Sequence, residues 1–226
     1  MNKKTLKALF VGAMLFASAM AAQANETFVV CSNTFDLVGS YPTGVTSYEW
    51  YDFGGTTIVN TTSTYSVSTV TPSTSAQKIQ YVTRGYNGSC WSEYDTITVY
   101  VLPALSTTIT AENSFGCDNN FSDSLTATTD LTSLDWTVMG GQNGIDIGNY
   151  TWSGGAGTAY GAHDSIYVVT QAGTYLATVG YDVSTLPSTI NGVTVDGHKV
   201  DCTSDAATGV TITTSTAPNA PTVTIQ

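Results

Sequence analysis

Charged residues are scarce in this sequence, and basic residues are the scarcest. Only 10% of the 226 residues are charged, with six lysines and arginines against seventeen aspartates and glutamates. Lys3, Lys4 and Lys7 supply half of the basic residues; without them three basic and seventeen acidic residues remain, a net charge of −14. Such a surface repels nucleic acids and anionic membranes. We therefore expect neither as a partner.

Catalytic motifs are also missing from the sequence. It has no Gly-x-Ser-x-Gly elbow, no phosphate-binding loop and no His-Glu-x-x-His helix. A Ser-His-Asp arrangement would have to use His163 or His198, the two histidines, and the neighbour Asp164 does not by itself make a triad with His163. The sequence predicts that the protein is not an enzyme and carries no cofactor.

One acidic turn is a candidate Ca²⁺ site. Asp118, Asn119, Asn120 and Asp123 carry the oxygen ligands that Ca²⁺ prefers. The turn glycine and the distal glutamate of an EF-hand loop are missing, so an exposed acidic turn is the default interpretation and a Ca²⁺ site the alternative.

A helical period of 3.6 is absent beyond the first two dozen residues. Alternating runs such as 95–101 and 173–179 occur instead, separated by Gly, Pro, Asn and Asp. Thr, Val, Ile and Tyr are typical of strands with one wet and one buried face. The sequence predicts an all-β protein.

The first 24 residues have the pattern of a secretory signal. A basic start is followed by the short apolar run 8–21 and by Ala22-Gln23-Ala24, a small-x-small cleavage pattern. The apolar run is too short to span a membrane comfortably, and no later stretch resembles a spanning helix. We expect a mature chain from Asn25 that is exported, with no membrane insertion.

The rest of the chain is organised as a frame that occurs twice. A cysteine precedes a tryptophan by nineteen residues, and a second cysteine and an alternating run follow. The members are Cys31, Trp50 and Cys90 in the first copy, and Cys117, Trp136 and Cys202 in the second. Repetition of this kind predicts two copies of one module, with Trp50 and Trp136 as equivalent core residues; exposed tryptophans that stack on sugars are the alternative.

Export makes disulfides the expected state of the four cysteines. The repeat favours one bridge within each module, Cys31–Cys90 and Cys117–Cys202. A metal site is the rival interpretation, but no Cys-x-x-Cys spacing supports it.

Further motifs of the first module resemble a known family. They are Tyr48, Trp50, Asn87-Gly88-Ser89-Cys90 and Ile97-Thr98-Val99. This set is similar to the Ig-like repeat modules of secreted and surface proteins of bacteria, especially Bacteroidota. The second module departs from it in its longer loops and in residues 197–201. The resemblance implies two tandem Ig-like β-sandwiches and an adhesive, spacer or filament role outside a Gram-negative cell.

The expected organisation has four parts. A signal peptide (1–24) precedes the first Ig-like module (25–102), the second module with long loop insertions (103–216) and a tail (217–226). The loop aromatics of the second module, Tyr150, Trp152 and Tyr160, offer contacts for glycans if the protein is an adhesin or carbohydrate-binding module.

The tail suggests how copies of the protein join. Pro218 and Pro221 precede an alternating strand pattern, whose residues are Thr222, Val223, Thr224, Ile225 and Gln226. Ile109 lies eight positions before Cys117, and Ile225 would lie eight positions before Cys31 if Asn25 of a second copy followed Gln226. The tail therefore matches the opening strand that the first module lacks. We expect Pro221–Gln226 to pair with the next subunit near Phe28 and Val30, which makes a head-to-tail homopolymer; a tail that is disordered or pairs with its own module is the alternative.

Overall fold

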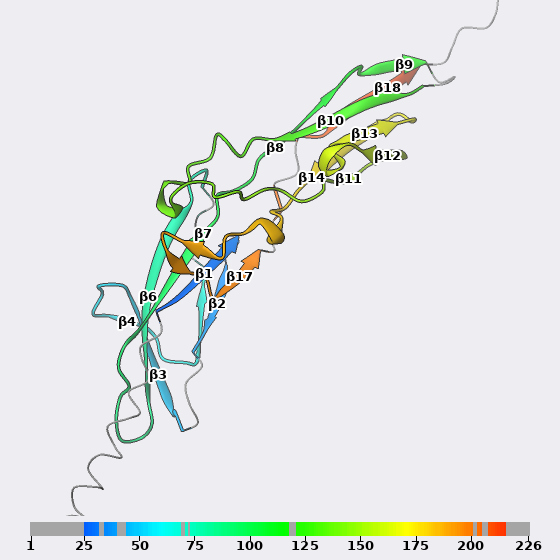
Figure 1. The fold of residues 1–226 in the computed structure, drawn as a ribbon. Coiled ribbons are helices and arrows are strands. Elements are labelled where there is room, and N and C mark those ends of the chain that lie inside the picture. The colour runs from blue at the N-terminus through cyan, green and yellow to red at the C-terminus, as the bar shows by residue number, and fades with distance from the viewer. Residues whose placement is uncertain are drawn as a thin grey trace, which may run out of the picture.

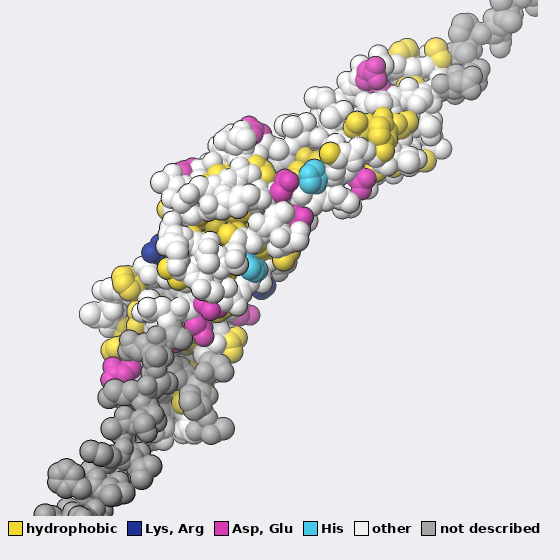
Figure 2. All heavy atoms as spheres, in the orientation of Figure 1, with side chains coloured by type: hydrophobic (Ala, Val, Ile, Leu, Met, Phe, Trp, Pro, Cys, Tyr) yellow, Lys and Arg dark blue, Asp and Glu magenta, His cyan; other side chains and the backbone are white. Residues whose placement is uncertain are grey.

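The computed structural model describes residues 25–31, 34–39, 44–68, 71, 73–117, 121–200, 203–204 and 208–215. The all-β prediction is confirmed, because the described elements are eighteen strands and three short 3-10 turns. The molecule is elongated, with an N-terminal and a C-terminal sandwich one beyond the other (Figure 1). Acidic side chains are scattered along the face seen in Figure 2, and basic ones are rare there.

The N-terminal sandwich packs a large sheet against a small one. The large sheet has the order β17 (Gly197–Val200), β1 (Glu26–Cys31), β7 (Asp95–Val101), β6 (Gln77–Tyr86), β3 (Ser47–Asp52) and β4 (Ile58–Asn60). The small sheet contains β2 (Phe35–Val38) and β5 (Thr64–Val67), which pair antiparallel. Trp50 is fully buried between the two, and its indole Nε1 donates a hydrogen bond of 2.8 Å to the Thr62 carbonyl.

The C-terminal sandwich has two four-stranded sheets. One has the order β12 (Gly157–Tyr160), β13 (Ile166–Val169), β10 (Asp123–Thr129) and β8 (Thr107–Ala111). The other has the order β11 (Thr151–Ser153), β14 (Gly173–Thr178), β18 (Val210–Ser215) and β9 (Phe115–Cys117). This division of strands is that of an immunoglobulin-type sandwich. Its own core is small and consists of Leu125, Val169, Tyr175 and Ile212.

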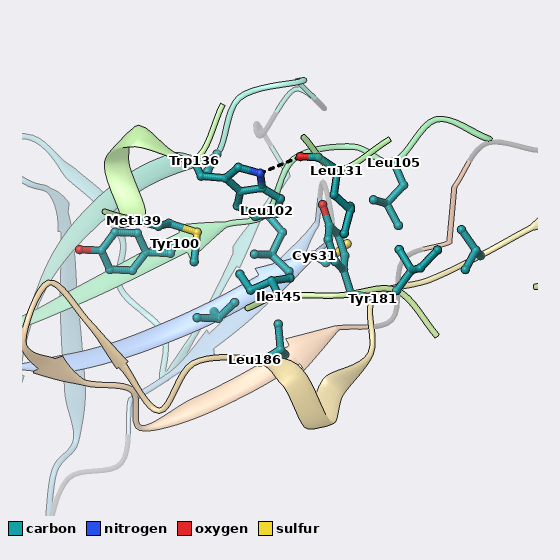
Figure 3. Packing of buried hydrophobic residues seen from close by; sticks show 14 of the residues in the cluster. Cys31, Tyr100, Leu102, Leu105, Leu131, Trp136, Met139, Ile145, Tyr181 and Leu186 are labelled. Carbon is teal, nitrogen blue, oxygen red and sulfur yellow. Dashed lines mark hydrogen bonds between the residues drawn. The ribbon is translucent and has the colours of Figure 1, made fainter. Parts of the chain in front are cut away.

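The largest apolar cluster lies where the two sandwiches meet (Figure 3). Long connections of the C-terminal half supply much of it, including Met139 of η1 (Thr137–Met139), Leu186 after η3 (Val183–Thr185), and Ile190 and Val195 of the hairpin built by β15 (Thr189–Ile190) and β16 (Val193–Thr194). The remaining short turn, η2 (Ala162–Asp164), follows β12. Tyr181 donates a hydrogen bond of 2.8 Å to the Pro103 carbonyl, and its burial raises its pKa. The junction is therefore a packed core and not an open hinge.

Trp136 belongs to this junction, so the prediction that it is the equivalent of Trp50 is wrong. It is buried and donates to the Leu131 carbonyl at 3.1 Å (Figure 3), but it precedes η1 and lies in no strand. The residue in the position of Trp50 is Trp152, because β11 pairs with β14 as β3 pairs with β6. The spacing of nineteen residues matched two tryptophans with different surroundings.

Residues 181–199 belong to the long insertions expected in the second module, but they are not a separate surface loop. Their last part, β17, pairs parallel with β1 and extends the N-terminal sheet (Figure 1). Asp196 fixes the start of β17, since its carboxylate accepts a hydrogen bond of 2.7 Å from the Thr27 amide and its own amide donates to the Thr27 carbonyl at 2.7 Å. The C-terminal half thus contributes a strand to the N-terminal sandwich.

The predicted disulfides are also wrong. Cys90 and Cys117 are exposed and carry free thiols, which excludes both Cys31–Cys90 and Cys117–Cys202. Cys31 is buried at the end of β1 and is disulfide-bonded, to neither of these two cysteines. Cys202 lies outside the described residues. The prediction used only the spacing of the cysteines in the sequence. Cys90 lies in the connection between β6 and β7, where its side chain is exposed.

Candidate functional site

One strand position is filled in the C-terminal sandwich but holds no described strand in the N-terminal one. The two sandwiches share part of their strand order, because β9 runs parallel to β18 as β1 runs parallel to β7, and β11 pairs with β14 as β3 pairs with β6. The strand after β9 is β10, which has two neighbours, β13 and β8. The strand after β1 is β2, and among the described residues it pairs with β5 alone. No described strand occupies the position in the N-terminal sandwich that β8 occupies in the C-terminal one.

β8 shows what a strand in that position does. It pairs antiparallel with β10 in the register Leu125↔Ala111, Ala127↔Ile109 and Thr129↔Thr107. Ile109 is partly buried and packs against both the junction cluster and the small C-terminal core. Successive side chains of a strand point to opposite faces, so every second residue of β8 faces the core at the edge of the sandwich. The backbone of β8 also supplies hydrogen-bond partners for the backbone of β10.

A groove of about 310 Å³ lies at the corresponding place in the N-terminal sandwich. It separates β2 from β1 and β17, and all four residues of β2 line it. The apolar lining consists of Phe28, Val30, Phe35, Leu37, Val38 and Ile97. Phe35 and Leu37 are directed inward and are only 4% and 7% exposed, whereas Val38 is 67% exposed at the rim. We call this groove, together with the unpaired edge of β2, the acceptor groove.

The polar rim of the acceptor groove is acidic at one end. Glu26 lies there, and its pKa is raised, first by burial and then by the nearby carboxylates of Asp95 and Asp196. Burial also raises the pKa of Asp95. His198 and Lys199 of β17 line the other wall. Gly197 fits there because a Cβ at this position would approach the Phe28 ring to 3.2 Å.

Two of the predicted subunit-contact residues, Phe28 and Val30, line this groove. The other predicted contact residues, Pro221, Thr222, Val223, Thr224, Ile225 and Gln226, lie outside the described residues. Sequence reasoning missed Phe35, Leu37 and Ile97. Phe35 and Leu37 alternate with polar or exposed residues in β2, and Ile97 belongs to the alternating run 95–101. Alternation predicts burial of these side chains, but only the position of β2 at a sheet edge shows that they line a groove.

The predicted glycan-contact residues do not form one exposed platform. Tyr150 is only 7% exposed and donates a hydrogen bond of 3.0 Å to the Thr129 hydroxyl, so its prediction as a glycan contact is wrong. Trp152 is half-buried, with its ring stacked on Tyr167 at 5.1 Å. Tyr160 is exposed. The long loop uses two of its three aromatics to pack itself.

The acidic turn gives no metal site in the part of the chain that the structure describes. Asp123 is buried, and its Oδ1 accepts hydrogen bonds from the amides of Asn113 and Ser124 at 3.0 and 2.8 Å. Asp118, Asn119 and Asn120 lie outside that part. Elsewhere in it, no three His, Cys, Asp or Glu side chains gather in a way that could hold a metal. Asp123 instead ties β10 to the end of β8.

Searches for known relatives give little beyond the fold. No protein-family model and no curated protein sequence matches the chain. Solved structures that match include the crystal structure of murine CEACAM1b, with 12% identity, a TM-score of 0.33, and coverage of 83% of this chain and 95% of that one. Fibronectin(III)-like modules of Clostridium thermocellum CbhA match with 11% identity, a TM-score of 0.32, and coverage of 86% and 93%. Both similarities are weak, so the topology above carries the argument. No helix among the described residues has the length and apolarity to cross a membrane.

Proposed function

We propose that the protein is a structural subunit of an extracellular fibre and that its N-terminal sandwich accepts a strand from another copy. The observation that carries this proposal is the edge of β2, beside which no described strand lies, with an apolar groove where β8 lies in the other sandwich. A sheet edge beside an apolar groove is the usual acceptor in strand addition, where main-chain hydrogen bonds supply affinity and alternate side chains supply specificity.

The occupant is the segment Thr222–Gln226 of a second copy. Its apolar residues alternate with threonines, so Val223 and Ile225 can face Phe35 and Leu37 while the threonines face solvent. Ile225 takes the place that Ile109 has in the C-terminal sandwich. Pro218 and Pro221 separate this segment from β18, because proline lacks the amide that a continuous ladder needs.

The geometry favours donation between copies. β18 is the last described strand, and it ends at the end of the C-terminal sandwich that lies away from the acceptor groove (Figure 1). A donor following β18 therefore meets the groove of a neighbour more readily than that of its own chain. Such a contact joins two different surfaces and does not close on itself, so repetition makes a fibre. The signal-like segment 1–24 fits assembly outside the cell.

The test is electron microscopy of the mature protein from Asn25, with and without Pro221–Gln226. The intact protein should form fibres and the shortened one should not. A subunit without a donor still has a groove, so it should end a growing fibre; mixing one part of it into about twenty of the intact protein should shorten the fibres.

Two full-length variants test whether fibre formation needs the apolar side chains of the tail and not only its length. Changing Val223 and Ile225 to Asp should abolish fibres, because each would place a charge in the apolar groove. Changing Thr222 and Thr224 to Ser is the matched control and should leave fibres unchanged. The proposal is wrong if the intact protein forms no fibres, or if the shortened protein forms the same ones.

A further inference from the structure

The outer face of the large N-terminal sheet carries a row of aromatic rings around one arginine. This row, called here the Arg84 strip, consists of Tyr51, Arg84, Tyr86, Trp91 and Tyr94. Trp91 and Tyr94 come from the β6–β7 connection, lie over the Arg84 guanidinium at 4.5 and 4.8 Å, and are 39% and 45% exposed. The row continues through Tyr86, 5.0 Å from Trp91, and Tyr51, 5.9 Å from Tyr94.

The strip lies on the face opposite the acceptor groove. Trp50 points into the sandwich, so its neighbours Glu49 and Tyr51 point outward, and the register pairs Glu49 with Arg84 and Tyr51 with Val82. The strip is therefore physically separate from the surface on which the proposed fibre contact depends.

A network of hydrogen bonds fixes the rings before anything binds. Arg84 Nε donates to Glu49 Oε2 at 2.7 Å, and the Tyr51 hydroxyl donates to the same oxygen at 2.6 Å. The Tyr51 hydrogen bond, and after it Arg84, lowers the pKa of Glu49. An isolated surface ion pair contributes little to stability. Here Glu49 holds the Arg84 side chain, and the Arg84 guanidinium packs against the Trp91 and Tyr94 rings. Rings held in place before binding lose less conformational entropy when a ligand binds.

A cleft of about 390 Å³ opens at one end of the strip. Tyr51 and Tyr94 form its aromatic wall, Val82 lines it from β6, and Gly55 and Thr56 border it from the turn between β3 and β4. This volume is at the lower end of the range of about 300–1,000 Å³ seen for small-ligand sites. The cleft offers ring faces together with hydroxyl groups.

We propose that the Arg84 strip binds a neutral carbohydrate chain, with one sugar in the Tyr51–Tyr94 cleft and further sugars along Trp91. The C–H face of a pyranose ring carries partial positive charge and stacks on the negative face of an aromatic ring. Sugar hydroxyls can share the charged hydrogen-bonding groups of Glu49 and Arg84. An anionic ligand fits poorly, because Glu49 neutralises Arg84 and the whole chain is acidic.

The test is titration of the mature protein with neutral hexasaccharides: maltohexaose, cellohexaose, laminarihexaose, mannohexaose and N-acetylchitohexaose. Tryptophan fluorescence can report binding, because Trp91 is exposed, Trp50 and Trp136 are buried, and Trp152 is half-buried against Tyr167 in the other sandwich. We expect at least one of these sugars to bind and to quench or shift the emission, and we expect Trp91→Phe to retain binding, measured by calorimetry.

Variants then assign the site. Tyr94→Ala should weaken binding about tenfold, the loss of one stacking ring, while Tyr94→Phe keeps the ring and should bind within about threefold of the original. Phe115→Ala removes an exposed aromatic ring from β9 of the C-terminal sandwich and is the control, with binding unchanged. The proposal fails if none of the five sugars binds, or if Tyr94→Ala binds as tightly as Tyr94→Phe. Both results are independent of fibre formation, which depends on the opposite face.

Discussion

A synthetic donor peptide should bind the acceptor groove of a subunit that lacks its own tail. The perturbation is deletion of Pro221–Gln226, followed by addition of a peptide with the sequence of those six residues. Phe35 and Leu37 form the floor of a groove of about 310 Å³, which is large enough to take up the side chains of Val223 and Ile225. Burying each of these side chains fully would contribute about 1.5–3 kcal/mol.

We expect the groove to bury the peptide side chains only in part, because its rim is open to solvent at Val38. Shortening Ile225 to Ala in the peptide should cost about 2 kcal/mol, the low end of such truncations, and so weaken binding about thirtyfold. Shortening Thr224, which faces solvent in the proposed register, should change binding less than about threefold. At a peptide concentration of about one hundred times Kd, the gain in unfolding free energy is about 2.7 kcal/mol, a rise in Tm of roughly 5–10 °C for a protein of this size.

The assay is thermal unfolding of the shortened protein, followed by circular dichroism, over a peptide titration. The control peptide has the same composition with Val223 and Thr224 exchanged and Ile225 and Gln226 exchanged, which moves both apolar side chains to the other face. Equal shifts with the two peptides, or no shift with either, would refute the argument that alternate side chains fill the groove.

Two further outcomes concern residues around the groove and the free thiols. Glu26→Gln should raise the free energy of unfolding at pH 7, because the raised pKa of Glu26 means that the folded state disfavours its charge; urea titrations should show the difference vanishing as the pH falls to about the usual value of 4.5. Iodoacetamide should label Cys90 and Cys117 in the folded protein and spare Cys31, as peptide mapping without reduction would show; protection of Cys90 would contradict the exposed, free state found here.

Many of the strands could be predicted, because burial of one face of a sheet makes apolar and polar residues alternate along each strand. The run 95–101 alternates because Ile97 and Val99 point into the N-terminal core, and β7 has the predicted bounds. The opening strand expected around Ile109 in the second module is β8, Thr107–Ala111. Period-two alternation directly reports which face of a strand is buried.

The pairings could not be predicted, because they depend on contacts that leave no pattern. β17 reads in sequence as Gly-His-Lys-Val, with two exposed side chains, and its place beside β1 is held by main-chain bonds and by Asp196. The match of Trp136 with Trp50 failed for a related reason. Any large apolar core can bury a tryptophan. Here the long loops of the C-terminal half form a core at the junction, and Trp136 is buried in it.

The edge of β2 without a described neighbour was partly predictable, because the sequence has no counterpart of β8 between Asn25 and Cys31 and has a strand pattern after Pro221. The Arg84 strip was not visible, because its rings are spread over two strands and a connection. Tyr51, Arg84 and Trp91 become neighbours only when β3 and β6 pair and the chain after Tyr86 folds back.

The pairing of β17 with β1 also sets the order in which the chain can fold. The hydrogen bond between the Thr27 amide and Asp196 joins residues 169 positions apart, so the outermost strand of the N-terminal sheet is added only after nearly the whole chain has been synthesised. Contacts of such long range slow folding and leave sheet edges exposed in the meantime. Until residues 197–200 are made, β1 has a neighbour only on its β7 side, and β2 pairs with β5 alone among the described strands. We therefore expect these edges to need protection from premature strand pairing during folding, and the folding half-time to depend on the docking of residues 181–200.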